Sequence, residues 1–343
     1  MWYRTILLLA ERGKDNLVYV HSHYHIDQNN YLIGSYMPNS KLSEAKIKKY
    51  DEFFTQYKDI EKEISAYLEY NPDVFRGKTV LLPCDDPEWS NFTKFFAQNF
   101  EKFGLKKLIS TSYAVDSKIY KNGYQPTLFE TSDPQFDKIK TTRNGKIFTL
   151  TRDKTGDHKV NVDDLEWHYL AGDGDFRSAE IKKLRDESDI IITNPPFSMF
   201  REFLAWIIEA GKQFVIISNL NAITYKEVFP LIKNDMMWMG NGFHAGNAYF
   251  STPFAKEYAE GVYNPETGLV KFRNVCWFTN LDHGRRHQPL PLMTIAENLR
   301  YSKHKEIKGK KSYDRYDNYD AIEVPFTDAI PSDYDGVMGV PIS

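Results

Sequence analysis

The chain has 343 residues, of which 41% are hydrophobic and 27% charged, a composition typical of folded globular proteins. Its two cysteines, Cys84 and Cys276, lie too far apart in the sequence for a metal-binding knuckle and give no disulfide framework. The apolar run at residues 6–10 is too short for a secretory signal, and no later run is long enough to cross a membrane, so we expect a cytoplasmic protein.

The charges are unevenly distributed along the chain, although the net charge is only −3. Residues 271–315 contain eleven Lys or Arg against four Asp or Glu, whereas residues 316–343 contain six carboxylates and neither Lys nor Arg. Such segregation is typical of a surface that binds an anion, but it is equally compatible with a solvated helix face beside an acidic loop.

The first half of the chain predicts the beginning of an α/β sheet. Residues 1–38 read as irregular strands, and residues 41–70 have apolar residues at helical spacing, most clearly from Tyr57 onward. "GKTVLLPCDD" then reads as a strand that runs into a loop, "SNFTKFFAQNFEKFG" as a helix that ends at Gly104, and "KLISTSY" as a second strand. A strand, a helix and a strand at this spacing form a βαβ unit, which predicts parallel pairing.

Residues 113–168 interrupt this pattern with a polar, turn-rich insertion, in which "TTRNGKIFTLTR" reads as a hairpin around Asn144 and Gly145. The pattern resumes with "WHYLAGDGDF", the helix "AEIKKLRDE", the strand "DIIITN", the helix "FREFLAWIIEAG" and the strand "QFVIISNL", and it fades near residue 250. We therefore expect an α/β fold with a doubly wound, mostly parallel sheet.

The segment "DIIITNPPF" ends a buried strand in an amide, two prolines and an aromatic ring. Ligands of doubly wound sheets bind at the carboxyl ends of the strands, where Asn194 is expected, and the prolines fix the loop before any ligand arrives. The Asn194 amide oxygen and the Pro195 carbonyl could each accept one hydrogen of an exocyclic amino group, with Phe197 stacked on its ring. The alternative is a simple turn in which Asn194 caps the next helix. The strand before the motif and the amphipathic helix after it favour the binding site.

Five other segments extend this interpretation: "YDEFFTQYKDIEKEI", "CDDPEWSNFTKFF", "GDGDFRS", "WFTNLDHGRR" and "YDNYDAIEV". Together with "TNPPFSMFREF" they resemble the EcoRI-type adenine-specific DNA methyltransferases, from about residue 41 to the end of the chain. The resemblance implies a Rossmann-like methyltransferase fold, S-adenosylmethionine as the cofactor and double-stranded DNA as the substrate. It predicts an N-terminal extension at residues 1–40, a catalytic domain at 41–255 that contains the insertion, and a smaller DNA target-recognition region at 256–343.

The resemblance also implies roles for individual residues. A flipped adenine would be held, while its amino nitrogen takes a methyl group in line from the cofactor, by Asn194, Pro195, Pro196 and Phe197. The residues implied at the cofactor are Phe54, Thr55, Asp85, Asp86, Asp173, Asp175 and Phe176. Those implied at the DNA are Arg285, Arg286, Lys308, Lys310 and Lys311.

Three features depart from the family pattern. The first loop, "LPCDDPEWSNF", contains no glycine, which leaves open whether Asp85 or Asp86 contacts the cofactor. The second strand ends in Ser112 and Tyr113 instead of the acidic residue that would bind the ribose hydroxyls. The family's chains continue beyond "DGVMGVPIS", so we expect a truncated recognition region.

Other functions stay open on the sequence alone. An NPPF loop could serve an RNA base or a protein glutamine amide, although the basic and aromatic residues at 271–316 favour nucleic acid, and a DNA-binding protein that has lost catalysis is a further alternative. "HSHYHID" places His21, His23 and His25 on one face of a strand, but no other histidine spacing completes a metal site, so we expect no metal. The family likeness also suggests a cognate restriction endonuclease encoded in another chain, whereas the recognised DNA sequence and the oligomeric state are undetermined.

Overall fold

The computed structural model of the protein describes residues 8–12, 18–22, 53–87, 90–114, 133–243, 247–289 and 291–340. The chain divides into two compact units. Residues 36–287 form the larger unit, and residues 1–35 together with 288–343 form the smaller one.

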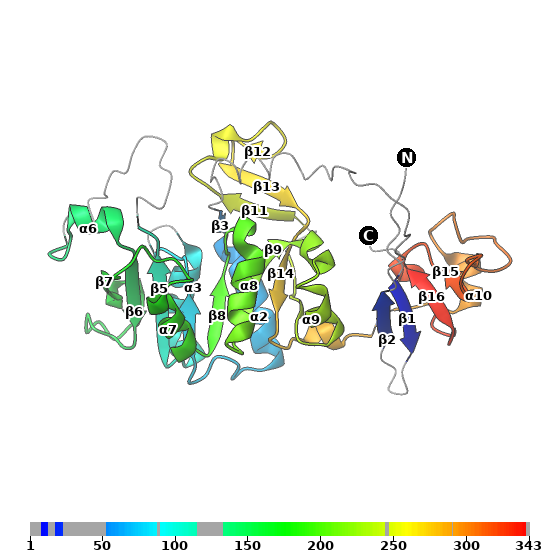
Figure 1. Ribbon diagram of the computed structural model, residues 1–343, viewed down its shortest axis with the longest axis horizontal. Helices are drawn as coiled ribbons and strands as arrows, with labels where there is room; N and C mark the ends of the chain where they lie inside the picture. Colours follow the sequence, from blue (N-terminus) through cyan, green and yellow to red (C-terminus); the bar gives the residue numbers. More distant parts are fainter. Residues whose placement is uncertain are drawn as a thin grey trace. The chain divides into compact units, whose positions relative to one another are not determined.

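The large sheet of the larger unit has the strand order β10-β14-β9-β8-β4-β5-β6-β7 (Figure 1). Its central strands β9, β8, β4 and β5 are parallel to one another, and the two strands on each side pair antiparallel. The sheet is therefore mixed, and the predicted parallel pairing is confirmed only for the central strands. The strands are β4 (Thr79–Leu82), β5 (Lys107–Ser112), β6 (Lys146–Leu150), β7 (Glu166–Tyr169), β8 (Ile190–Thr193), β9 (Gln213–Asn219), β10 (Trp238–Met239) and β14 (Val275–Thr279).

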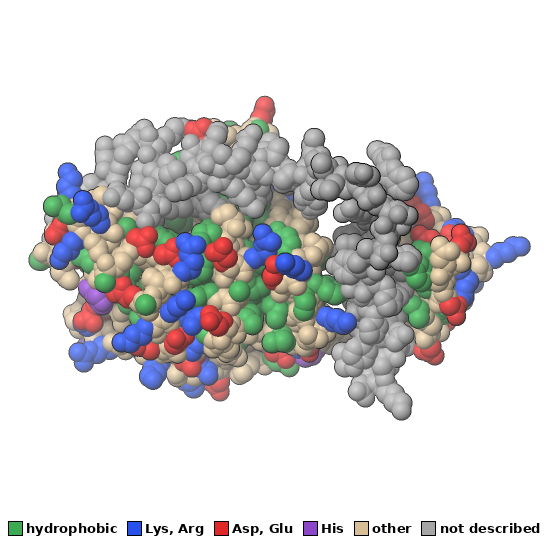
Figure 2. Space-filling model, in the orientation of Figure 1, with side chains coloured by type: hydrophobic (Ala, Val, Ile, Leu, Met, Phe, Trp, Pro, Cys, Tyr) green, Lys and Arg blue, Asp and Glu red, His purple; other side chains and the backbone are tan. Residues whose placement is uncertain are grey.

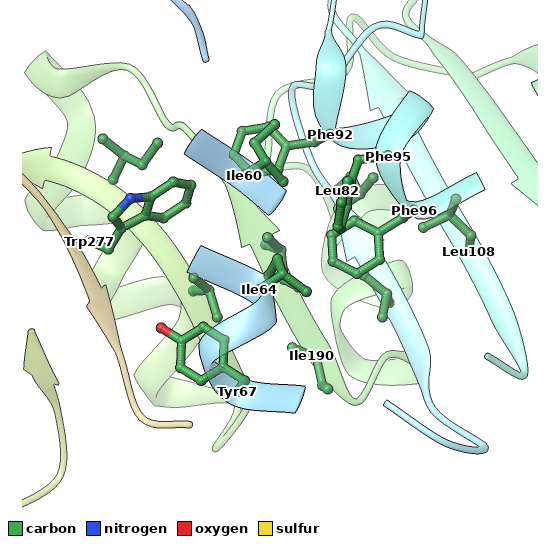
Figure 3. Packing of buried hydrophobic residues seen from close by; sticks show 14 of the residues in the cluster. Ile60, Ile64, Tyr67, Leu82, Phe92, Phe95, Phe96, Leu108, Ile190 and Trp277 are labelled. Carbon is green, nitrogen blue, oxygen red and sulfur yellow. The ribbon is translucent and has the colours of Figure 1, made fainter. Parts of the chain in front are cut away.

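Helices pack on both faces of the large sheet. Because successive side chains of a strand point to opposite faces, Val80 and Leu82 of β4 lie in one buried cluster and Leu81 lies in another. The first cluster includes the apolar sides of α2 and α3 (Figure 3), and the second includes those of α7 and α8. The helices of this unit are α2 (Tyr57–Tyr70), α3 (Asn91–Gln98), α4 (Phe100–Phe103), α6 (Lys138–Arg143), α7 (Ala179–Glu187), α8 (Phe200–Glu209) and α9 (Phe229–Lys233), with the 3₁₀ turns η2 (Val162–Asp164), η3 (Phe197–Met199), η4 (Leu220–Thr224), η6 (Ala255–Glu257) and η7 (Gly284–His287).

The hairpin predicted around Asn144 and Gly145 is wrong. Residues 138–143 form helix α6, whose N-terminal amides are capped by the Asp137 carboxylate, and β6 joins the large sheet between β5 and β7. Gly145 is needed for close packing and not for a turn, since a Cβ atom there would lie 2.4 Å from the Ser112 carbonyl oxygen. Part of the predicted insertion is therefore built into the sheet.

Strand β14 also extends the sheet beyond the point where the sequence pattern fades. It pairs with β9 from Val275 opposite Asn219 to Thr279 opposite Val215, and its Trp277 is fully buried. The expectation that the sheet fades near residue 250 is therefore wrong. A five-residue strand that pairs antiparallel at such a sequence distance has no local partner by which a pattern could reveal it.

A small second sheet in the larger unit has the order β12-β13-β11-β3. Its strands are β3 (Phe54–Thr55), β11 (Asn247–Ser251), β12 (Tyr263–Asn264) and β13 (Leu269–Arg273). The buried Ala248, Phe250 and Val270 attach one face of this sheet to the cluster that also contains α2 and α3. The two sheets therefore share one buried cluster and belong to the same unit (Figure 1).

The smaller unit contains a third sheet of order β15-β16-β1-β2. Its elements are β1 (Leu8–Arg12), β2 (Val18–Ser22), α10 (Ile295–Tyr301), β15 (Ala321–Glu323), η8 (Thr327–Ala329) and β16 (Val337–Val340). Helix α10 begins with a capping box in which Thr294 and Glu297 satisfy each other's backbone amides, and the core includes Tyr313, Val324 and Met338. In the part of the chain that the structure describes, no helix is both long and apolar enough to cross a membrane.

Candidate active site

A pocket opens at the carboxyl ends of three neighbouring parallel strands of the large sheet. The loop after β4 contributes Cys84, Asp85 and Asp86, while Tyr113 follows β5 and Asn194 follows β8. This is the edge at which ligands of α/β sheets bind. The complete lining is Phe53, Phe54, Thr55, Cys84, Asp85, Asp86, Ser90, Phe92, Tyr113, Asn194 and Pro196.

The amide of Asn194 is oriented by one hydrogen bond. Its Nδ2 donates to the main-chain oxygen of Phe53 at 2.8 Å, while its Oδ1 is buried and has no hydrogen-bond donor among the described residues. An orphaned buried acceptor costs about 1–3 kcal/mol, which a bound donor would recover. The geometry therefore offers an acceptor for an N–H group that enters the pocket.

The segment 53–55 is a second wall of the pocket. It is held from three sides: by Asn194, by the Asn91 side chain, which donates to the Thr55 carbonyl at 2.7 Å, and by pairing with β11. The Thr55 hydroxyl is buried and, like the Asn194 oxygen, lacks a partner among the described residues. Two polar atoms of the pocket are thus available to a polar ligand.

In the glycine-free first loop, Cys84 adopts a backbone conformation that glycine usually supplies. This residue has φ = 63°, in the left-handed region where glycine is usually found, and its amide donates to the Thr111 hydroxyl at 3.3 Å. Such a conformation costs roughly 1–2 kcal/mol in a residue with a Cβ atom. The anchoring of the loop on β5 offsets this cost.

Asp85 and Asp86 have different environments. The buried Asp85 carboxylate accepts hydrogen bonds from the Ser90 hydroxyl, from the Thr93 amide at 3.0 Å and from the Thr93 hydroxyl at 2.6 Å. Burial raises the pKa of Asp85 to about 7, even though these hydrogen bonds oppose the shift. Both residues line the pocket, but Asp85 also ties the loop to helix α3, whereas Asp86 is half-buried.

Tyr113 was missed as a pocket residue by the sequence analysis, which noted only that an acidic residue was lacking there. Burial raises the pKa of the Tyr113 phenol, and its neighbours Cys84 and Asp175 raise it further, so the group stays neutral. The sequence feature that could have identified Tyr113 is its position at the end of the second parallel strand, next to the first loop. Four more lining residues missed in this way are Phe53, Cys84, Ser90 and Phe92.

The ring of Phe197 lies in the hydrophobic core beneath the pocket. It is 8% exposed and stacks on Phe53 with 5.7 Å between ring centroids and 24° between planes. Phe53 in turn contacts Phe250 and Phe272 of the small sheet. Phe197 thus supports the pocket wall through Phe53, and Pro196 is the proline of the motif that lines the pocket.

The "GDGDF" segment packs beside the pocket without lining it. Gly174 has φ = 90°, and a Cβ atom there would lie 2.5 Å from the Ser112 carbonyl oxygen. The Asp175 carboxylate is bound by Arg177 at 2.5 Å, and this hydrogen bond lowers the pKa of Asp175. Phe176 is buried against Phe203 and Trp206 of the helix layer, whereas Asp173 accepts a hydrogen bond from the Asp175 amide at 3.1 Å.

The five predicted DNA-binding residues are divided between the two units. Arg286 pairs with Asp235 and Asp282 and lies with its guanidinium 3.8 Å from the centre of the Trp238 ring, so its side chain is only 25% exposed. Arg285 donates to the Asn241 carbonyl and belongs to the same unit. In the smaller unit, the three predicted lysines are Lys308, Lys310 and Lys311, of which Lys310 pairs with Asp314.

Metal binding gains no support from the described residues, among which no group of three or more potential ligands could hold an ion. The histidine cluster of the sequence falls outside this test. His21 lies in β2, whose side chains are not described, and His23 and His25 lie outside the described residues.

Known proteins resemble the chain over most of its length. A family model described as "Adenine-specific methyltransferase EcoRI" matches residues 41–343. The Type II methyltransferase M.EcoRI of Escherichia coli is 42% identical over 308 residues, which cover 89% of this chain and 85% of that protein. The Type II methyltransferase M.MpnI of Mycoplasma pneumoniae is 32% identical over 311 residues, which cover 88% of this chain and 80% of that protein. No solved structure matches the chain. The pocket with its NPPF loop and the extent of these matches lead to one conclusion: the chain belongs to the EcoRI family of adenine-specific methyltransferases.

Proposed function

We propose that this protein transfers a methyl group to N6 of an adenine within a specific sequence of duplex DNA. The observation that carries the proposal is the Asn194 amide, whose nitrogen is bound to the Phe53 carbonyl and whose buried oxygen still requires a donor. An adenine amino group supplies such a donor and is planar enough to enter a narrow pocket.

Asn194 acts on the amino group by accepting one of its hydrogens. This hydrogen bond orients the nitrogen and raises its electron density, and we propose the Pro195 carbonyl as the acceptor for the second hydrogen. No strong base is required, because the acceptors position the nucleophile and the amino proton can leave after the transfer. In this structure the Phe197 ring packs on Phe53. Its stacking on the base stays a prediction.

We infer that the methyl donor is S-adenosylmethionine, which supplies an electrophilic methyl group when it is bound. The residues at the pocket fit such a polar ligand, because the Thr55 hydroxyl has no partner among the described residues and Asp86 and Tyr113 line the same pocket. Thr55 and Phe54 would contact its methionine part, and Asp86 and Tyr113 its ribose. Asp173, Asp175 and Phe176 would position the neighbouring loop around its adenine.

We also propose that the chain recognises its DNA through residues beyond 255, as the family likeness implies, with Arg285, Lys308, Lys310 and Lys311 at phosphates. The half-buried guanidinium of Arg286 is paired with two carboxylates, which favours a structural role for that residue. A doubly wound methyltransferase core fits the parallel centre of the large sheet and its helices on both faces. A cytoplasmic location and a cognate restriction endonuclease belong to the same proposal.

Methyl transfer from radiolabelled S-adenosylmethionine tests the function directly. We expect label in duplex DNA, recovered as N6-methyladenine after digestion, and none in RNA or protein. Label in RNA or in a protein glutamine would replace the proposed substrate. Tight DNA binding without calorimetric binding of S-adenosylmethionine would instead favour a DNA-binding protein that has lost catalysis.

A further inference from the structure

The outer face of the small sheet is a continuous surface of polar, basic and aromatic side chains. Strands β11 and β13 bury Ala248, Phe250 and Val270 on their inner face. Because alternate residues of a strand point to opposite faces, Tyr249 and its cross-strand neighbour Lys271 lie on the outer face.

The side chains of this outer face suit a nucleic-acid strand. Tyr249 is 39% exposed, and the Lys271 ammonium lies 5.9 Å from the centre of its ring. Next to this pair, Asn247 lies opposite the exposed Arg273. Strands β11 and β13, with the sequences NAYFS and LVKFR, contain no carboxylate. Two cations beside an exposed aromatic ring can hold phosphates and stack on a base or sugar.

The surface is continuous with the pocket through β3. Ser251 of β11 pairs with Phe54, and Phe54 and Thr55 line the pocket that contains Asn194. The carboxylates Glu260 and Glu266 lie at the opposite edge, next to β12 and in the turn that leads to β13. In the strand order, Tyr249 lies on β11, the strand next to β3, whereas Lys271 and Arg273 lie on β13, between β11 and the acidic edge.

Other exposed surfaces fit a polyanion less well. On the face of the larger unit seen in Figure 2, Lys and Arg side chains are intermixed with Asp and Glu side chains over α7 and α8. Arg286 is already paired with two carboxylates. Among the described parts of the larger unit, the outer face of β11 and β13 combines the exposed Arg273, the half-buried Lys271, an exposed ring and continuity with the pocket.

We propose that the outer face of β11 and β13 binds the DNA strand that flanks the flipped adenine. Lys271 and Arg273 contact phosphates beside the target, and Tyr249 stacks on the neighbouring nucleotide. The inference rests on the proposed function and deepens it, because it assigns the DNA contact closest to the chemistry. It adds a surface within the larger unit to the region at Arg285 and beyond that the family likeness implies.

Fluorescence anisotropy of a labelled duplex that the wild-type protein methylates tests this surface. We expect the double variant Lys271→Ala, Arg273→Ala to bind this duplex roughly tenfold more weakly, and its slope of log K against log salt to fall by about 2, one unit per lost phosphate contact. Tyr249→Ala should weaken DNA binding severalfold without changing the salt slope. Tyr249→Phe should bind DNA as tightly as the wild type, since stacking needs only the ring. The matched control is Lys182→Ala, Lys183→Ala, two exposed cations on α7, which should change neither quantity.

The outcomes separate this inference from the function on which it rests. If the Lys271, Arg273 variant keeps the wild-type affinity and salt slope while it methylates DNA normally, the surface is wrong and the function stands. If the wild-type protein methylates no DNA, both proposals fail. Because all three side chains point outward, thermal melts and calorimetric binding of S-adenosylmethionine should match the wild type, so weaker DNA binding cannot be attributed to misfolding.

Discussion

The side chain of Asn194 donates a hydrogen bond to the main-chain carbonyl of Phe53 at 2.8 Å, across 141 residues of sequence. This bond decides the orientation of the amide, with its nitrogen toward Phe53 and its oxygen left to accept. Because Phe53 and Thr55 belong to the same short segment, this bond also helps to position the Thr55 hydroxyl, the second unpartnered polar group of the pocket. The NPPF loop and the segment at 53–55 therefore act as one structure.

Replacing Asn194 with alanine should lower the rate of methyl transfer on the order of 100-fold, comparable to the loss of one catalytic hydrogen bond. Binding of S-adenosylmethionine, measured by calorimetry, should change by less than about threefold. Asn99→Ala is the matched control, since Asn99 also donates to a main-chain carbonyl, that of Phe95 at 2.9 Å, but does not line the pocket. Undiminished transfer by Asn194→Ala would rule out the acceptor role.

The Asp85 carboxyl should make stability fall as the pH rises. Its pKa is raised from 3.8 to about 7 by burial, so between about pH 4 and pH 7 the folded state retains a proton that the unfolded chain releases. Stability then declines across this window by up to about 1.4 kcal/mol per pH unit and levels off above it. Asp85→Asn removes this titration, so the free energy of unfolding of the wild type relative to the variant should drop by about 3 kcal/mol from pH 4.5 to pH 7.5 in urea melts. If the unfolding free energies of the wild type and the variant instead changed in parallel with pH, the pKa of the buried Asp85 would not be raised.

Cys84 offers a test of the left-handed loop. Cys84→Val should lower the free energy of unfolding by about 1–2 kcal/mol, because a β-branched residue tolerates φ = 63° poorly. Cys84→Gly should change it by less than about 1 kcal/mol, since relief of the strain is offset by the greater entropy of the unfolded chain. Denaturant melts of the two variants side by side measure the difference. Equal destabilisation by both would mean that the thiol contacts matter more than the backbone.

Tyr113→Phe should weaken the binding of S-adenosylmethionine about fivefold, which corresponds to one hydrogen bond of about 1 kcal/mol, while kcat at saturating cofactor stays unchanged. We propose that the phenol takes the place of the carboxylate that the family pattern has at the end of the second strand. Tyr57→Phe is the control, because the Tyr57 hydroxyl donates to Gln98 at 2.8 Å outside the pocket lining. An unchanged KM for the cofactor in Tyr113→Phe would exclude this contact.

Arg286→Ala should act on stability and not on DNA binding. Its removal leaves Asp282 without one of its cationic partners and uncovers Trp238, so the free energy of unfolding should fall by about 1–3 kcal/mol. The salt slope of DNA binding should stay at the wild-type value, whereas Arg285→Ala should lower it by about 1. If Arg286→Ala melts normally and loses salt-dependent affinity, Arg286 is a DNA contact after all.

Local patterns were sufficient for the central part of the fold. The alternation of apolar runs with amphipathic segments predicted β4, α3, β5, α7, β8, α8 and β9, because each of these elements buries its own regular face. The Asn-Gly pair was misread, since a glycine required by close packing looks the same in the sequence as one required by a turn. Asp137, which caps α6, was the stronger local signal.

The sequence by itself determined the position of Asn194, because a strand followed by an amide and two prolines confines a hydrogen-bonding group to the edge of the sheet. Only the tertiary structure decided which groups surround it. Pairing of β3 with β11 and of β14 with β9 joins segments that are far apart in the chain, and no local period encodes such contacts. The folded structure also distinguishes two adjacent aspartates that look alike in the sequence. The oxygens of Asp85 are bound by Ser90 and Thr93, whereas Asp86 is half-buried at the same pocket.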